Sequence, residues 1–162
     1  MLSLYYVDDE RTIRKFVKAF VEKLNKLEDS TLIQWDDEKI YCGEGATEKF
    51  FSTISKLDDS HLNDCLFLLD VRMPVPKGLE KPAFWGDYEG TKSDVCGFAL
   101  AKYLIEEKSV NKKRIKLFSA YKDIIENEFF NFFNQERADS GNMFISKYDL
   151  DVGFFKSWVE NI

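Results

Sequence analysis

Four short, largely apolar runs of this chain each lead into a side chain suited to phosphoryl chemistry. The runs and the residues that follow them are 4–7 before Asp8 and Asp9, 66–69 before Asp70, 115–118 before Ser119, and 143–146 before Lys147. In an open parallel α/β sheet, functional groups collect beyond the carboxyl ends of the strands, so these side chains are expected to form one site. Carboxylates, a hydroxyl and an ammonium group together could bind and accept a phosphoryl group.

The three acidic residues predict a divalent cation in this site. Two carboxylates about 4 Å apart repel by roughly 4 kcal/mol at an effective dielectric near 20, so a dry cluster of three would partly protonate or distort. Oxygen ligands without histidine or cysteine favour Mg²⁺. Asp70 stands alone at the end of its strand and is the expected nucleophile, which would carry the phosphoryl group as an acyl phosphate. Lys147 and Ser119 would contact the phosphoryl oxygens.

Hydrophobic periodicity predicts the elements that position these residues. Short apolar runs, typical of buried strands, alternate with stretches whose apolar residues recur every three or four positions, as in amphipathic helices. Strands are expected at residues 1–7, 39–42, 65–69, 115–118 and 143–146, with 31–35 as a candidate for an additional strand. Helices are expected at residues 11–27, 47–57, 97–105, 124–133 and 152–162.

This alternation predicts an α/β fold, a flavodoxin-like doubly wound sheet of five parallel strands in the order 2-1-3-4-5. Parallel neighbours require right-handed crossovers, so helices should cover both faces of the sheet. Strands one and three are neighbours in this order, which would bring Asp8, Asp9 and Asp70 into one crevice. Residues 71–94 contain all three prolines and several glycines, so an extended loop is expected after the third strand.

Composition limits the class of protein. The chain has 162 residues, 44% of them hydrophobic, and is expected to form one domain over residues 1–162. Its net charge of −6 should repel nucleic acid. Its three cysteines lack CxxC spacing, which predicts reduced thiols in a cytoplasmic protein, with neither a disulfide nor a zinc site. No apolar run approaches the roughly 20 residues of a membrane span, so no membrane contact is expected.

Four motifs in a fixed order carry a resemblance to a known family. They are the acidic pair Asp8-Asp9 followed by Glu10, the D-V-R-M-P run at residues 70–74, Ser119-Ala120, and Lys147. With these motifs at four strand ends, nearly the whole chain resembles the receiver domain of two-component response regulators, the phospho-acceptor of bacterial signal transduction. The chain differs from that family in Tyr148, where a proline usually follows the lysine, and in the longer segment between Pro74 and Gly97.

The resemblance implies a role for each site residue. Asp70 would be phosphorylated, Asp9, Asp70 and the carbonyl of Arg72 would ligate Mg²⁺, and Asp8 would position a metal-bound water. Ser119 and Lys147 would hold the phosphoryl oxygens. Ser119 and Phe144 would act as the switch, and Arg72 and Tyr121 would tune the loss of the phosphoryl group, their bulk predicting a long-lived phosphorylated state.

The resemblance also implies partners. A histidine kinase or a histidine phosphotransfer protein would supply the phosphoryl group, because His61, the only histidine, precedes the strand that carries Asp70 and lies a strand length from it. The face formed by helix four, strand five and helix five would be read by a downstream effector or a linked output domain. The same face is a candidate for homodimer contacts, and the Phe-rich residues 129–133 suit either a partner or the extended loop.

Two other functions remain open at this point. One is a receiver-like interaction module that is not phosphorylated. The other is a Mg²⁺-dependent aspartyl phosphohydrolase, although such enzymes usually place a second acid two residues after the nucleophile, where this chain has Arg72. In the receiver interpretation the protein is not an enzyme and at most catalyses its own phosphorylation and dephosphorylation. The aromatic residues at 83–88 could form a lid beside the site or could pin the loop to the core.

Overall fold

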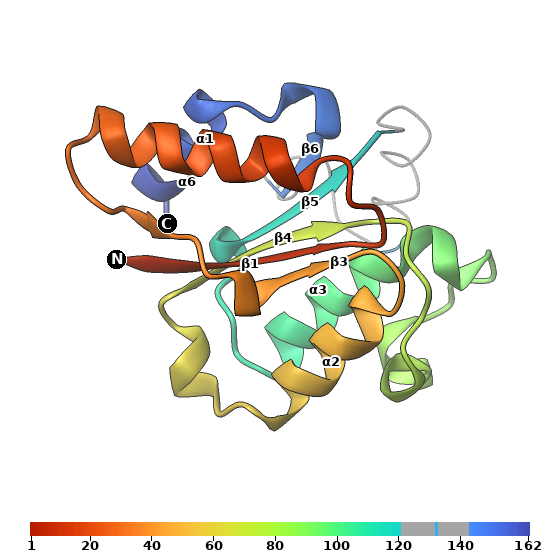
Figure 1. The fold of residues 1–162 in the computed structure, drawn as a ribbon. Helices are drawn as coiled ribbons and strands as arrows, with labels where there is room; N and C mark the ends of the chain where they lie inside the picture. The colour runs from red at the N-terminus through yellow and green to blue at the C-terminus, as the bar shows by residue number, and fades with distance from the viewer. Residues whose placement is uncertain (121–131, 133–142) are drawn as a thin grey trace.

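The computed structural model describes residues 1–120, 132 and 143–162, and it arranges them as a central sheet with helices on both sides (Figure 1). The strands are β1 (Leu2–Asp8), β2 (Ile33–Gln34), β3 (Ile40–Cys42), β4 (Cys65–Asp70), β5 (Ile115–Ser119) and β6 (Phe144–Ser146). The α-helices within the described residues are α1 (Arg14–Leu27), α2 (Ala46–Lys56), α3 (Cys96–Glu106) and α6 (Val152–Glu160). The helix predicted at residues 124–133 lies outside the described residues, except for Phe132.

The sheet is parallel throughout the described strand pairs and has the order β2-β1-β4-β5-β6, with β3 also paired to β1. β2 pairs with Leu2 and Ser3, whereas β3 pairs with β1 from Tyr6 to Asp8, so the two short strands follow each other along one edge of β1. If β2 and β3 are counted together as the second strand, the strand order of the sheet is the predicted 2-1-3-4-5. The α/β class and the parallel sheet are therefore confirmed, and the candidate strand at residues 31–35 is present as β2.

The core lies in two layers, one on each face of the sheet. Tyr5, Val7 and Phe67 face one layer, where they pack against α2 and α3. Tyr6 and Leu68 face the other layer, which contains α1 and α6. Figure 1 shows α1 and α6 together on one side of the sheet and α2 and α3 on the other. Within the described ranges, none of the helices is long and apolar enough to cross a membrane.

The segment at residues 71–94 has the irregular structure predicted for it. It contains only the short 3₁₀ turns η3 (Lys77–Leu79), η4 (Pro82–Phe84) and the beginning of η5 (Lys92–Val95). Phe84 and Trp85 are buried, and the indole Nε1 of Trp85 donates a hydrogen bond of 2.7 Å to the carbonyl of Leu79. Trp85 also packs edge-on against Phe132, and Phe84 against Tyr103 of α3. These aromatic residues therefore pin the loop to the core.

Candidate functional site

Three carboxylates meet where β1 and β4 end side by side. Asp8 closes β1, Asp9 follows it, and Asp70 closes β4, the neighbouring strand. Each of the three offers one carboxylate oxygen, and these oxygens all lie within 4.8 Å of one another. Asp8 is 0% exposed and Asp70 is 4% exposed, whereas Asp9 lies nearer to the solvent. The fold thus brings together the three acidic residues that the strand pattern predicted to converge.

Lys147 inserts its ammonium group between two of these carboxylates. Its Nζ lies 3.3 Å from Oδ2 of Asp8 and 3.4 Å from Oδ1 of Asp70, and its side chain is only 8% exposed. The same Nζ lies 5.0 Å from the ring centroid of Phe118, at a distance typical of a cation–π contact. Phe118 was not predicted from the sequence as part of the site. It occupies β5, across which Lys147 must reach from β6.

Asp8 is held from three directions. The hydroxyl of Tyr6 donates a hydrogen bond of 2.9 Å to Oδ2 of Asp8, the same oxygen that Lys147 contacts. The backbone N–H of Glu10 donates to Oδ1 at 2.9 Å. A carboxylate has about four acceptor positions, so roughly one remains on Asp8, enough for a single further donor such as a bound water.

Tyr6 is a site residue that the sequence reasoning missed. A signal was available, because residues two apart in a strand point to the same face and Tyr6 lies two positions before Asp8. Burial, followed by the charge of Asp8, raises the pKa of the Tyr6 hydroxyl. Tyr6 therefore remains a neutral hydrogen-bond donor to Asp8.

The charges in this cluster do not balance. Burial raises the pKa of Asp70 to about 8; Lys147 opposes this effect, and the charges of Asp8 and Asp9 add to it. The pKa of Asp9 is also raised, first by burial and then by Asp8 and Glu10. Burial disfavours the Lys147 ammonium, but Asp70 and Asp8 outweigh it and leave the pKa of Lys147 raised. The single ammonium of Lys147 faces the carboxylates of Asp8 and Asp9, and a third carboxylate once Asp70 loses its proton. An all-oxygen donor set with this excess of negative charge fits a hard divalent cation.

A cleft of about 360 Å³ gives access to the cluster. Its walls are Asp9, Glu10, Thr12, Ile13, Asp70, Arg72, Ser119, Ala120, Lys147 and Tyr148. Five predicted site residues therefore share one cleft, whereas the buried Asp8 is not part of its lining. Tyr148 is 82% exposed at this cleft.

Ser119 lines this cleft from the end of β5, where it is buried and in register with Ser146 of β6. Phe144 is partly buried at the start of β6, in register with Leu117, and packs against the core layer of α2 and α3. Tyr121 lies outside the described residues.

Gly97 fixes the approach of α3 to the end of β4, the strand that carries Asp70. Its backbone N–H donates a hydrogen bond of 2.9 Å to the carbonyl of Val71. A Cβ atom at this position would overlap the carbonyl oxygen of Asp70 and crowd the Cα of Val71. Glycine is therefore required for close packing here, a constraint that depends on a backbone far away in the sequence.

Comparison of the chain with protein-family models, curated proteins and solved structures found no match.

Proposed function

We propose that this protein is a response regulator receiver domain with a flavodoxin-like, doubly wound sheet, and that Asp70 accepts a phosphoryl group in a Mg²⁺-dependent reaction. The contact of Lys147 with both Asp8 and Asp70 carries the proposal. It joins the ends of three strands at a cleft that Ser119 also lines. Carboxylate, ammonium and hydroxyl groups arranged in this way suit an aspartyl acceptor and the binding of its phosphoryl oxygens.

The chain's own residues would each contribute to the transfer. A carboxylate oxygen of Asp70 attacks phosphorus, and the bond from phosphorus to the donor nitrogen or oxygen breaks. The electron pair leaves with the donor, so the ring nitrogen of a phosphohistidine donor keeps that pair and takes one proton from solvent, which gives neutral imidazole. Lys147 contacts Asp70, so its ammonium could also bind the negatively charged phosphoryl oxygens once they are attached there. Ser119 would donate a hydrogen bond from its hydroxyl to another phosphoryl oxygen.

The acidic residues are suited to hold Mg²⁺. Asp9 and Asp70, with the carbonyl of Arg72, would be the ligands, and Asp8 would fix a bound water through its remaining acceptor position. When bound, the cation would neutralise the acidic cluster and the incoming phosphoryl charge.

The proposal includes partners and a location. A histidine kinase or histidine phosphotransfer protein donates the phosphoryl group, and an effector protein or linked output domain reads the change at Ser119 and Phe144. β6 and α6 belong to the face that would be read, which could also pair two copies of the chain. The three free thiols, Cys42, Cys65 and Cys96, suit the reducing cytoplasm.

The test is phosphorylation by a small donor. The protein is incubated with Mg²⁺ and acetyl phosphate, and its intact mass is followed. The wild type and Asp64→Asn, which changes an exposed acid at the opposite end of β4, should gain one phosphoryl group. Asp70→Asn and a sample treated with EDTA should gain none.

The result separates the proposal from its alternatives. If Mg²⁺ neither binds nor supports modification, the protein is an unphosphorylated interaction module. Rapid turnover of many phosphate esters would instead identify a phosphohydrolase. A phosphoryl group that still forms in Asp70→Asn would overturn the assignment of the acceptor.

A further inference from the structure

Tyr148 carries an exposed aromatic side chain at the cleft that contains Asp70. It directly follows Lys147, whose ammonium contacts Asp70, and it lines the same cleft while remaining 82% exposed. Asp70 is only 4% exposed, so it lies at the inner end of the cleft and Tyr148 lies at the mouth. An aromatic ring left in water gains free energy from contact with another ring, so Tyr148 is suited to contact a ligand that enters the cleft.

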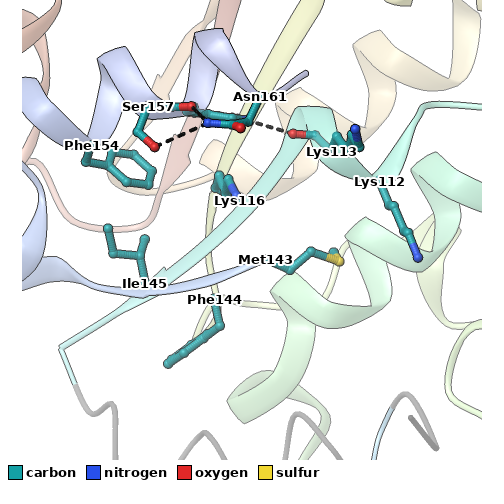
Figure 2. Close-up of a pocket in the computed structure, with 10 residues that line it drawn as sticks. Lys112, Lys113, Lys116, Met143, Phe144, Ile145, Phe154, Ser157 and Asn161 are labelled. Carbon is teal, nitrogen blue, oxygen red and sulfur yellow. Dashed lines mark hydrogen bonds between the residues drawn. The ribbon is translucent and has the colours of Figure 1, made fainter. Parts of the chain in front are cut away.

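The backbone around Tyr148 is held in place on both sides. Before it, the backbone N–H of Tyr148 donates a hydrogen bond of 3.3 Å to Oγ of Ser146 at the end of β6. After it, Leu150 is buried in the core layer of α1 and α6. Figure 2 shows Phe154 of α6 and Ile145 of β6 directed toward each other, and both pack against that layer. The exposed side chain of Tyr148 is therefore carried by a fixed segment beside the cleft.

The side of the cleft that includes Tyr148 is poor in positive charge. Thr12 and Ile13 line the cleft from the connection between β1 and α1, and Tyr148 lines it from the connection between β6 and α6. Because α1 and α6 cover the same face of the sheet, these three residues lie on the same side of the cleft (Figure 1). Glu10 also lines the cleft from the first connection. Apolar and acidic neighbours favour an uncharged ring over an anionic group here.

Transfer to Asp70 requires the leaving group to lie near the cleft mouth. In phosphoryl transfer the attacking and leaving atoms lie roughly in line, on opposite sides of phosphorus. Since the attacking carboxylate of Asp70 is at the inner end of the cleft, the leaving group must point outward, to where Tyr148 is exposed. The cleft volume of about 360 Å³ lies within the range of about 300–1,000 Å³ that small-molecule sites occupy, so a phosphoryl group and one ring have room there.

We propose that the ring of Tyr148 contacts the leaving group of the phosphoryl donor and favours donors whose leaving group is an aromatic ring. The imidazole of a phosphohistidine is such a leaving group, whereas the acetate of acetyl phosphate is not. This role of Tyr148 rests on the proposed function, phosphorylation of Asp70, and adds a specificity-determining residue to it. One ring–ring contact is expected to raise the rate of transfer about fivefold.

Two small donors test the selectivity. Phosphoimidazole and phosphoramidate both carry phosphorus on nitrogen, but only phosphoimidazole has a ring as its leaving group. A carboxylate oxygen of Asp70 attacks phosphorus and the phosphorus–nitrogen bond breaks; the nitrogen keeps the electron pair and takes one proton from solvent, which gives imidazole or ammonia. The full chain is incubated with Mg²⁺ and each donor, and the second-order rate of phosphorylation is followed by intact mass. The ratio of the two rates is then compared between variants, so that the donors' own reactivities cancel.

Three variants assign the selectivity to the ring of Tyr148. Tyr148→Ala should lower the rate with phosphoimidazole about fivefold and leave the rate with phosphoramidate unchanged. Tyr148→Phe keeps the ring and should leave both rates unchanged. Phe16→Ala is the matched control, because Phe16 of α1 is also an exposed aromatic residue, 57% exposed, but is not part of the cleft lining. It should leave both rates unchanged.

The possible failures point to different conclusions. If neither donor modifies the wild type, the proposed function is wrong, and the role of Tyr148 is wrong with it. If phosphoramidate modifies the wild type but the ratio of rates is the same in Tyr148→Ala, only the role of Tyr148 is overturned. An equal decrease with both donors would show that Tyr148 supports the site itself. An equal increase with both would show that its ring obstructs the cleft, and either result would also overturn the proposed selectivity.

Discussion

The Nζ atom of Lys147 lies 3.4 Å from Oδ1 of Asp70, although the strands that lead to the two residues are not neighbours in the sheet. β5 separates β4 from β6, and neighbouring strands are about 4.8 Å apart, so the contact must span roughly 10 Å of sheet. The lysine side chain does so by crossing the ring of Phe118. The length and the apolar stem of the Lys147 side chain are therefore as important for this contact as its charge.

Lys147→Met should destabilise the metal-free protein. The change leaves the buried carboxylate of Asp8, and that of Asp70 where it is ionised, without the ammonium of Lys147, and loss of one partner of a buried ion pair costs about 3 kcal/mol. Urea unfolding in EDTA measures this loss. Lys156→Met breaks the exposed contact with Glu28 and should cause no measurable change, because solvent screens that pair. An equal decrease in the free energy of unfolding in the two variants would contradict the role given to Lys147.

Asp70→Asn should stabilise the metal-free protein increasingly as the pH rises. The pKa of Asp70 is about 8 in the folded protein against 3.8 for an ordinary aspartate, so the folded state holds a proton that the unfolded state has lost. The stability that this proton contributes is present at low pH and is lost as the pH rises through about 8. At pH 8.5 the variant should melt at least about 5 °C higher than wild type, since 1 kcal/mol corresponds to roughly 2–4 °C.

Thermal unfolding of the two proteins from pH 5 to pH 9, in EDTA, measures the difference. The gap in melting temperature should narrow steadily toward pH 5. A gap that stays constant across this range would show that Asp70 titrates as an ordinary surface carboxylate.

Tyr6→Phe should lower the free energy of unfolding by about 2 kcal/mol, because a buried carboxylate loses one of its donors. Tyr5→Phe is the matched control. It removes a hydroxyl from the adjacent position of β1, on the face that packs against α2 and α3, away from Asp8. Denaturant unfolding of both variants provides the comparison, and a larger loss for Tyr5→Phe would contradict the proposed support of Asp8 by Tyr6.

Gly97→Ala should lower the free energy of unfolding by about 2–3 kcal/mol, because the new methyl group must displace the backbone at Asp70. Gly153→Ala, also at the second position of a helix, is the control. There the methyl group would meet only the Asp151 side chain, 3.3 Å away, which can adjust. Urea unfolding should therefore show a change below about 1 kcal/mol for Gly153→Ala. Similar losses at both positions would exclude the close approach as the cause.

Arg72→Ala should shorten the lifetime of the phosphorylated protein. Arg72 lines the cleft beside Asp70, where its bulk is expected to hinder an attacking water. Decay of the Mg²⁺-bound phosphoprotein, followed by intact mass, should take minutes or longer in wild type. The variant should decay roughly tenfold faster, a change of about 1.4 kcal/mol in the barrier. Wild-type decay within seconds would contradict the prediction.

Local patterns were enough to predict most of the elements. The apolar run before Asp70 became the fully buried strand β4, and the three- and four-residue spacing after Arg11 became α1. These predictions succeed because burial of one face makes apolar residues recur at a fixed spacing, and burial of both faces of a strand makes a continuous apolar run. The same patterns did not show that β2 and β3 would share one edge of β1, because that depends on how the chain between them turns.

The sequence by itself determined which side chains end the strands, and thus that Asp8, Asp9, Asp70, Ser119 and Lys147 would gather at one edge of the sheet. Strand direction and order require this in a parallel α/β fold. Only the tertiary structure decided the contacts among them, and it added partners such as the Tyr6 hydroxyl and the ring of Phe118. The physical reason is distance along the chain: Lys147 and Asp8 lie 139 positions apart, so their contact arises from packing across the sheet.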